Sequence, residues 1–242
     1  KKNIKKMKIQ SKFEEYIIYN KNKIKISSKE IKKGDIFLAL KGKNFHGNRF
    51  IVSSIKKGAK FCLTDNRNFN NNNNKIIFVK NIFEYLKNLA NKKRKAYNGK
   101  VIGITGSAGK TTLKETLAFF LRKKHKISYS QKSYNNELGV LISILNLDLN
   151  ATFSIFEIGT NNFGEIKYLS NMVKPSEIFI TNIQSTHLEN FKTKKNIAKE
   201  KSDIFISKYN KNRKKLYLNI TNNYEKAILD KALKEKKLKI VR

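Results

Sequence analysis

The stretch from Val101 to Thr112 constrains the fold of this chain more than any other. It begins with a short run rich in β-branched residues, passes through a turn with glycines at 106 and 109, and continues into apolar residues at helical spacing. These apolar residues are Leu113, Leu117, Phe120 and Leu121. The pattern predicts a buried strand, a glycine-rich loop and an amphipathic helix, which together are typical of a phosphate-binding loop.

Such a loop offers backbone N–H groups to an anion, because glycine lets the main chain approach a phosphate and the helix N-terminus adds positive charge. Lys110 would reach the outer phosphates, and the Thr111 hydroxyl can ligate Mg²⁺. The predicted phosphate-binding residues are Gly106, Ser107, Ala108, Gly109, Lys110, Thr111 and Thr112. The match to G-x-x-x-x-G-K-[ST] is incomplete, because Ile104 occupies the first glycine position. A purely structural turn is therefore the alternative.

Two further strand patterns follow, at Phe153 to Ile158 and at Ile178 to Asn182, with helical segments between them. Alternating strands and helices predict a parallel sheet, and ligands of such sheets bind at the carboxyl ends of the strands. Glu157 lies near the end of one strand and can hold Mg²⁺; the alternative is a solvated or helix-capping carboxylate. His187 follows the other strand as a candidate metal ligand, with a hydrogen-bonded loop histidine as the alternative.

Length and patterning divide the 242 residues into two predicted domains, residues 1–99 and residues 100–242, with the boundary at Gly99. In the first domain we expect one strand within residues 1–26, around Tyr16 to Tyr19. The other elements expected there are strands at 36–40, 61–64 and 76–79, a short helix that Gly58 ends, and a helix over 82–97. The predicted fold class is α/β, with a small α/β domain followed by a parallel-sheet domain of the phosphate-loop type.

The chain carries 53 Lys and Arg against 18 Asp and Glu, a formal net charge of +35. A charge of this size is typical of proteins that bind nucleic acid or an anionic membrane surface. The lysines are scattered over nearly every segment, however, and asparagine is abundant, which favours a compositional bias at solvated positions. A basic, nucleic-acid-binding protein with a phosphate loop stays the alternative.

The single cysteine, Cys62, lies in an apolar run, which excludes a disulfide framework and a cysteine-ligated metal site. No apolar stretch approaches the ~20 residues that span a bilayer, and the lysine-rich start lacks the apolar region of a signal peptide. We therefore expect a cytoplasmic protein with no membrane insertion.

Four motifs together resemble the Mur ligase family, the ATP-dependent amide ligases of peptidoglycan synthesis. They are Thr105 to Thr112, Tyr134-Asn-Asn-Glu-Leu-Gly139, Glu157-Ile-Gly-Thr-Asn161 with Gly164-Glu165-Ile166, and Thr181-Asn-Ile through His187-Leu-Glu189. The likeness runs from about Ser27 to the C-terminus. The Asn135-Asn136 pair is similar to the family members that join D-alanyl-D-alanine to UDP-N-acetylmuramoyl-tripeptide.

The resemblance implies that residues 1–99 bind the UDP part of the substrate and that residues 100–242 form an incomplete, central ATP-binding domain. It implies ATP and two Mg²⁺ ions as cofactors. The implied catalytic residues are Lys110, Glu157, His187 and Lys201, and the implied metal-binding residues are Thr111, Glu157, His187 and Lys201. Lys201 would act as a carbamate, with Lys199 as the less favoured choice. Asn182 would lie near the nucleotide.

The implied substrate-binding residues are Ser28, Asn135, Asn136 and Asn161. Ser28 lies where the family has Asp-Ser-Arg and this chain has Ser27-Ser28-Lys29. The implied reaction passes the ATP γ-phosphate to the terminal carboxylate of the tripeptide, and the amine of D-alanyl-D-alanine then displaces phosphate from the acyl phosphate. We expect a monomer that binds no specific nucleic acid.

The family has a third, C-terminal domain, which this sequence lacks. We therefore expect a fragment of a longer protein that binds ATP weakly and does not complete the ligation by itself, with a decayed reading frame as the alternative. Another ligase of the same superfamily, of the MurE or folylpolyglutamate synthetase type, is the alternative function.

Overall fold

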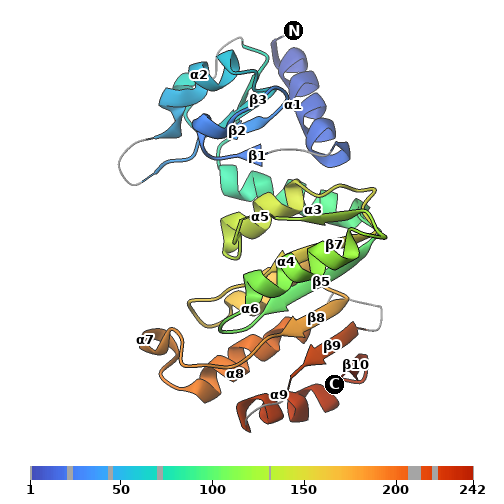
Figure 1. Cartoon of the computed structure of the whole chain (residues 1–242). Helices are drawn as coiled ribbons and strands as arrows, with labels where there is room; N and C mark the ends of the chain where they lie inside the picture. Colours follow the sequence, from blue (N-terminus) through green and yellow to red (C-terminus); the bar gives the residue numbers. More distant parts are fainter. Residues whose placement is uncertain are drawn as a thin grey trace. The chain divides into compact units, whose positions relative to one another are not determined.

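The computed structural model describes residues 2–20, 24–42, 46–69, 73–130, 132–206, 214–219 and 223–241. The chain divides into two compact units. One comprises residues 1–96 and 144–149, and the other comprises residues 97–143 and 150–242. Each unit contains its own parallel sheet with helices packed beside it (Figure 1).

The sheet of the first unit has four parallel strands in the order β1-β2-β3-β4. The strands are β1 (Ile24–Lys25), β2 (Ile36–Leu38), β3 (Phe61–Thr64) and β4 (Ile76–Phe78). The helical elements of residues 1–96 are α1 (Lys2–Tyr19), η1 (Ser28–Glu30), η2 (Gly47–Phe50), α2 (Ile51–Lys56), η3 (Arg67–Phe69) and α3 (Ile82–Ala96). The strands predicted at 36–40, 61–64 and 76–79 are confirmed, as are the helix that Gly58 ends and the helix that follows residue 81.

The strand predicted around Tyr16 to Tyr19 is wrong, because this segment lies in the long helix α1. Phe13 and Ile17, four residues apart on one helix face, are fully buried. Phe13 packs edge-to-face against Phe61 at 5.2 Å between ring centroids and stacks on Tyr85 of α3 at 6.2 Å. Tertiary packing of this face outweighs the β-branched run Ile17-Ile18 that favours a strand.

Lys93 of α3 forms hydrogen bonds with the C-terminal end of α1. Its side chain is fully buried, and its ammonium donates hydrogen bonds to the carbonyl oxygens of Ile17 (2.7 Å), Asn20 (2.9 Å) and Leu145 (2.7 Å). Carbonyl groups at a helix C-terminus have no partner within the helix, so a lysine satisfies them. Burial lowers the pKa of Lys93 to about 7, and the charge of Asp148 opposes this shift.

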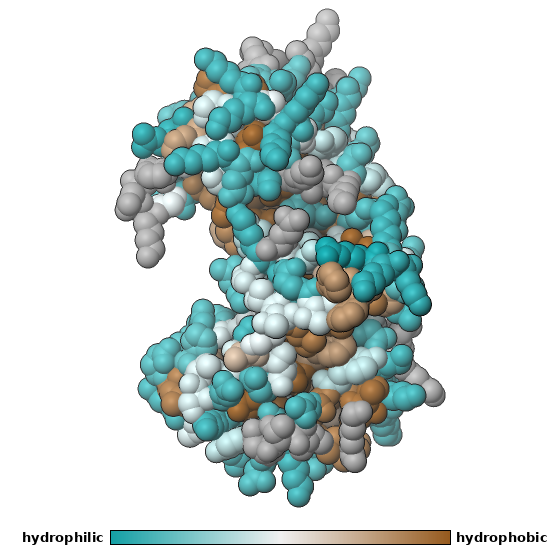
Figure 2. All heavy atoms as spheres, viewed as in Figure 1, coloured by the Kyte–Doolittle hydropathy of each residue, from teal (hydrophilic) through white to brown (hydrophobic). Residues whose placement is uncertain are grey.

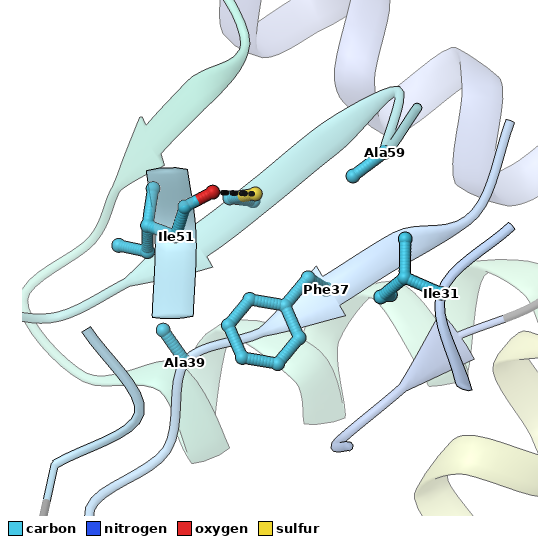
Figure 3. Close-up of a cluster of buried hydrophobic side chains, with 6 residues drawn as sticks. Ile31, Phe37, Ala39, Ile51 and Ala59 are labelled. Atoms are coloured by element: carbon cyan, nitrogen blue, oxygen red, sulfur yellow. Dashed lines mark hydrogen bonds between the residues drawn. The ribbon is translucent and has the colours of Figure 1, made fainter. Parts of the chain in front are cut away.

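A hydrophobic cluster beside the first sheet contains Ile31, Phe37, Ala39, Ile51, Ala59 and Cys62 (Figure 3). Phe37 and Cys62 come from the neighbouring strands β2 and β3, which are paired in register. The Cys62 thiol donates a 3.9 Å hydrogen bond to the carbonyl oxygen of Ile51 in α2, and this bond joins the helix to the sheet.

We predict that Cys62 does not react with a thiol reagent in the folded chain at pH 8. Burial raises the pKa of the Cys62 thiol to about 12, with a smaller opposing effect of Lys75, and the thiolate is the reactive form. Titration with Ellman's reagent is expected to detect no thiol before unfolding and one thiol per chain in guanidinium. Rapid reaction of the folded chain would contradict the burial of this side chain.

The sheet of the second unit has six parallel strands in the order β10-β9-β8-β5-β7-β6. Its strands are β5 (Lys100–Thr105), β6 (Ile127–Tyr129), β7 (Phe153–Glu157), β8 (Glu177–Ile180), β9 (Lys214–Leu218) and β10 (Leu238–Val241). The helical elements of this part of the chain are α4 (Lys110–Leu121), α5 (Glu137–Leu145), α6 (Glu165–Val173), α7 (Leu188–Phe191), α8 (Lys194–Ser202), η4 (Asp203–Phe205) and α9 (Asn223–Leu233). The predicted α/β fold class is confirmed.

Strand β5 lies inside this sheet, and the connections along the chain add later strands first on one side of it and then on the other. The chain leaves β5 through α4 to β6 on one side, and it later crosses from β7 through α6 to β8 on the other side. Right-handed crossovers in opposite directions place α4 and α6 on opposite faces of the sheet. The carboxyl end of β5 is therefore the topological switch point, where ligands of open α/β sheets bind.

Hydrophilic residues are spread over both units on the face shown in Figure 2, with hydrophobic residues visible between them. Among the residues that the structure describes, no helix combines the length and the apolar character needed to cross a membrane.

Candidate functional site

The glycine-rich loop joins β5 to α4 and has the predicted strand, loop and helix arrangement. Two of its glycines have positive φ angles, +145° at Gly106 and +78° at Gly109. A Cβ atom at Gly106 would collide with Thr181 Oγ1, whereas a Cβ atom at Gly109 would meet no atom within 4 Å. Gly106 is thus required by both conformation and space, and Gly109 by conformation alone.

The segment after β8 holds this loop in shape. The Asn182 main-chain oxygen accepts a 3.0 Å hydrogen bond from Ser107 N, and its side-chain oxygen accepts a 2.9 Å bond from Ala108 N. The Thr181 hydroxyl donates a 2.6 Å bond to the carbonyl oxygen of Ala108. Asn182, predicted near a nucleotide, therefore lies directly against the loop.

Lys110 is the first residue of α4, and its ammonium lies over the loop. It donates hydrogen bonds to the carbonyl oxygens of Gly106 (2.8 Å) and Ser107 (3.1 Å). Burial lowers the pKa of Lys110, and the charge of Glu157 opposes that effect. A phosphate group at this position would offer the ammonium a stronger, charge-assisted bond than the two carbonyl groups do.

Glu157, at the end of β7, is buried with an exposed fraction of 3% and meets the loop from the neighbouring strand. Its Oε2 accepts a 3.2 Å hydrogen bond from the Thr111 hydroxyl, and its Oε1 lies 3.1 Å from Lys114 Nζ. The Lys114 contact is an ion pair without the alignment of a hydrogen bond. Thr111 Oγ1 also lies 3.0 Å from Ser133 Oγ.

Sequence reasoning missed Lys114 and Ser133. The signal for Lys114 was present, because it follows Lys110 by four residues and so lies on the same face of α4. Ser133 carried no signal, since it lies in the irregular segment between β6 and α5.

A small cavity of about 80 Å³ opens beside the loop. The predicted site residues that line it are Gly106, Ser107, Lys110, Asn135, Asn136, Asn161, His187 and Lys201. Other lining residues are Gly159, Thr160, Glu165 and Thr186. The structure thus brings together residues that follow β5, β6, β7 and β8, all at the carboxyl edge of one sheet.

Lys201 enters the cavity from α8 and is 3% exposed. Its ammonium donates a 3.0 Å hydrogen bond to the carbonyl oxygen of Gly106. Burial lowers the pKa of Lys201 to about 8; the charge of Lys110 lowers it further, and that of Glu200 opposes both. Lys199, the less favoured alternative in the sequence, is exposed.

His187 precedes α7 in the left-handed conformation, with φ = 56°. Its side chain is 44% exposed, and Nδ1 lies 3.7 Å from Glu189 Oε1. Among the described interactions, His187 contacts Glu189, whereas Glu157 contacts Thr111 and Lys114. No described interaction connects His187 with Glu157. Asn190 Nδ2 donates a 2.8 Å bond to the carbonyl oxygen of Asn161 and so ties this loop to the one after β7.

The predicted asparagines have structural contacts as well as cavity positions. Asn136 Oδ1 accepts a 2.9 Å bond from Gly139 N and so caps α5. The side chain of Asn135 covers Gly159, where a Cβ would come within 2.9 Å of its Cγ. Asn161 N donates a 2.7 Å bond to Glu165 Oε2. Burial raises the pKa of Glu165, but hydrogen bonds from Asn161 and Asn162 outweigh it and leave the pKa below its usual value.

Ser28 belongs to the first unit, where it begins η1. Its carbonyl oxygen accepts a 3.0 Å hydrogen bond from Lys57 Nζ. A lysine charge therefore lies beside the predicted UDP-binding serine.

A larger groove of about 650 Å³ adjoins the other side of the loop. Ala108 and Gly109 of the loop, Asn182 after β8 and Leu113 of α4 line it. On the sheet, Phe179 of β8 and Tyr217 of β9 stack with parallel rings at 4.3 Å between centroids. This size and this mixture of apolar and polar groups are typical of small-ligand sites.

The described residues contain no group of three or more His, Cys, Asp and Glu side chains arranged to hold a metal ion. Mg²⁺ is commonly held by one or two carboxylates together with substrate phosphates and water, rather than by a protein cage. Thr111 and Glu157 supply two hard oxygen donors 3.2 Å apart beside the loop. These residues fit Mg²⁺ bound with a nucleotide.

The sequence matches two family descriptions, the Mur ligase middle domain over residues 104–242 and the Mur ligase family, catalytic domain, over residues 22–94. A UDP-N-acetylmuramoyl-tripeptide–D-alanyl-D-alanine ligase of Rickettsia prowazekii is 39% identical over 87% of this chain and 46% of its own length. The enzyme of that name from Bacillus subtilis is 28% identical over 79% of this chain and 42% of its own length.

Among solved structures, the MurF ligase of Thermotoga maritima in complex with ADP superposes with a TM-score of 0.72 at 28% identity. The match covers 93% of this chain and 50% of that protein. This chain therefore spans about half the length of the relatives that it matches. The middle-domain match alone covers more than half of the sequence, and the chain belongs to the Mur ligase family.

Proposed function

We propose that the second unit binds Mg·ATP at the carboxyl edge of its sheet. The phosphates lie along Gly106 to Thr112, the base enters the groove beside Phe179 and Tyr217, and Mg²⁺ is held by Thr111 and Glu157. The observation that carries this proposal is the convergence of the Lys110 ammonium, the first turn of α4 and the Thr111–Glu157 pair at the switch point. Bound Mg²⁺ would supply charge neutralisation for phosphoryl transfer.

The overall reaction that we propose is that of the Rickettsia and Bacillus relatives as their names state it, joining D-alanyl-D-alanine to UDP-N-acetylmuramoyl-tripeptide. The γ-phosphate of ATP passes to the terminal carboxylate of the tripeptide to give an acyl phosphate and ADP. The amine of D-alanyl-D-alanine then attacks the acyl carbon, forms the amide and releases phosphate. A monomeric state and a cytoplasmic location stay predictions.

The chain's own residues contribute mainly position and charge to this chemistry. Lys110 neutralises charge on the transferring phosphoryl group, and the loop N–H groups fix the phosphate chain. Asn135, Asn161 and His187 line the adjoining cavity, where the acyl carboxylate would meet the γ-phosphate. Ser28, with Lys57 beside it, would hold the UDP part in the first unit.

Trapping of the acyl phosphate with hydroxylamine tests this proposal without requiring the second half of the reaction. The full chain is incubated with ATP, Mg²⁺, hydroxylamine and UDP-N-acetylmuramoyl-tripeptide, and mass spectrometry is expected to detect the tripeptide hydroxamate together with ADP. Two other acceptors of the phosphate are tested in parallel. UDP-N-acetylmuramoyl-dipeptide represents the MurE type of ligase, and a folate glutamate represents the folylpolyglutamate synthetase type. Hydroxamate formed only on one of these would contradict the tripeptide assignment.

We predict that Lys201 forms a carbamate with dissolved carbon dioxide. Carbamate formation needs a neutral amine, and a pKa of about 8 leaves roughly a tenth of the Lys201 amine neutral at pH 7, far more than for an ordinary lysine. Carbon-13 NMR in labelled bicarbonate is expected to show a protein-bound carbamate signal that Lys201→Arg removes. The variant Lys199→Arg should keep it, and a signal that survives Lys201→Arg would contradict the assignment.

A further inference from the structure

Lys114 is a fully buried cation in the second turn of α4. Its ammonium lies 3.1 Å from Glu157 Oε1, 3.2 Å from Glu115 Oε1 and 3.2 Å from the carbonyl oxygen of Lys132. The contact with the Lys132 carbonyl is a hydrogen bond, and the contacts with the two carboxylates are ion pairs. Of the two carboxylates, that of Glu157 is buried and that of Glu115 is 46% exposed.

A buried ion pair is by itself weak support for fold stability. Removing two charges from water costs several kcal/mol per ion, and apolar side chains of similar volume are often equally stable in the same place. Stability alone therefore does not account for a lysine at this position, whereas its contacts with the nucleotide site do.

The contacts of Lys114 fix the geometry of the two oxygen donors that we assign to Mg²⁺. Because Lys114 holds Oε1 of Glu157, Oε2 is directed at the Thr111 hydroxyl, 3.2 Å away. The bond from Lys114 to the Lys132 carbonyl anchors the segment that carries Ser133, whose hydroxyl lies 3.0 Å from Thr111 Oγ1. Lys114 thus contacts Glu157 directly and the segment of Ser133 through Lys132, and both of these groups lie beside the Thr111 hydroxyl.

We propose that Lys114 is a positioning residue of the nucleotide site, which holds the Glu157 carboxylate and the Ser133 segment so that Thr111 and Glu157 present their oxygens together. This inference rests on the proposed function. Groups that orient metal ligands typically contribute 10- to 100-fold to metal affinity. Lys114 therefore raises the affinity for nucleotide chiefly when Mg²⁺ is present.

A variant that keeps the net charge separates positioning from long-range attraction. Lys114→Met combined with Glu115→Gln removes one positive and one negative charge. Calorimetric titration of the full chain with ADP, in Mg²⁺ and in EDTA, gives the Mg²⁺-dependent gain in affinity. We expect the double variant to lose at least about tenfold of this gain, with the affinity in EDTA changed by less than about threefold.

Three control variants show whether a loss of the Mg²⁺-dependent gain is specific to the Lys114 charge. Glu115→Gln alone is expected to keep the gain, because that side chain is 46% exposed and its described ion pair is with Lys114 rather than with Thr111 or Glu157. Lys93→Met removes another fully buried lysine, in the first unit, and should lower thermal stability without changing the gain. Lys114→Arg keeps a charged donor and should retain most of the gain.

If the folded double variant keeps the full Mg²⁺-dependent gain in ADP affinity, the inference is overturned. The inference is also overturned if Lys114→Arg loses as much of this gain as the double variant does, because altered packing would then explain the loss in both variants. If the double variant does not fold, the comparison of Lys114→Arg with Lys114→Gln decides in the same way, with the larger loss expected for Gln. A wild-type chain that binds ADP equally with and without Mg²⁺ would overturn the proposed metal site, and this inference with it.

Discussion

Lys110→Ala is expected to weaken the binding of Mg·ATP to the chain by about 10- to 100-fold, as measured by calorimetric titration. Hydrogen bonds to charged groups contribute ~1.5–3 kcal/mol, and each 1.4 kcal/mol corresponds to a factor of ten. The ammonium already lies over the loop, within 2.8 Å of the Gly106 carbonyl oxygen, so little rearrangement is needed to reach a phosphate. Fold stability should change little, because both hydrogen bonds described for this lysine stay within its own loop.

Lys123→Ala is the matched control for this prediction. Lys123 follows α4 at its opposite end, is exposed, and contacts the rings of Phe119 and Phe120. The affinity of this variant should equal that of the wild type. Similar losses in both variants would show that general positive charge, rather than the loop lysine, attracts the nucleotide.

The pH dependence of binding gives a second measurement on Lys110. Since burial lowers the pKa of this lysine, its charged form is lost at a lower pH than that of an exposed lysine. Affinity for ATP should therefore fall as the pH rises into the alkaline range in the wild type. The slope should be smaller in Lys110→Ala, and equal slopes would contradict the assigned contact.

Gly106→Ala is expected to abolish nucleotide binding and to lower the free energy of unfolding by about 2–5 kcal/mol. A left-handed conformation costs an L-residue about 1–2 kcal/mol, and overpacking a filled site adds about 1–3 kcal/mol. The added methyl group would collide with Thr181 Oγ1, and Thr181 also bonds to Ala108 within the loop. The loop must therefore shift away from the segment after β8.

Gly109→Ala distinguishes the effect of backbone strain from that of a steric clash, such as the one with Thr181 at Gly106. Its φ of +78° is also left-handed, but a Cβ at this position meets no atom within 4 Å. We expect a loss of about 1–2 kcal/mol in the free energy of unfolding and weaker, though measurable, binding. Thermal unfolding and calorimetry test both variants, and a Gly106→Ala protein as stable as Gly109→Ala would contradict the close contact with Thr181.

The sequence predicted the fold best where local pattern and tertiary packing agree. Strand β3 was predicted with its observed bounds because Phe61 to Thr64 is a buried β-rich run between polar segments. The strand and helix around the phosphate loop follow from glycine spacing and helical periodicity. Helix α1 was missed because its burial depends on Phe13 meeting Phe61 and Tyr85, which lie far away in the sequence.

For the candidate site, the sequence predicted residue types that meet at strand ends, and the structure places most of them around one cavity. The sequence showed Lys114 four residues after Lys110, but in a chain with 53 Lys and Arg this spacing did not single it out, because its burial is known only from the structure. Strand β6 was not predicted individually, since Ile127 to Tyr129 is a short, half-buried edge strand. The burial of Lys114 and the half-buried position of β6 both depend on tertiary packing, which the local sequence does not show.

A crystal structure of the chain with Mg·ADP tests the central claim most directly. The account predicts that the phosphates lie along Gly106 to Thr112, with Lys110 Nζ bonded to a phosphate oxygen and the metal held by Thr111 and Glu157. The base should lie in the groove beside Phe179 and Tyr217. Phosphates bound away from this loop, with Lys110 still on the carbonyl oxygens of Gly106 and Ser107, would contradict it.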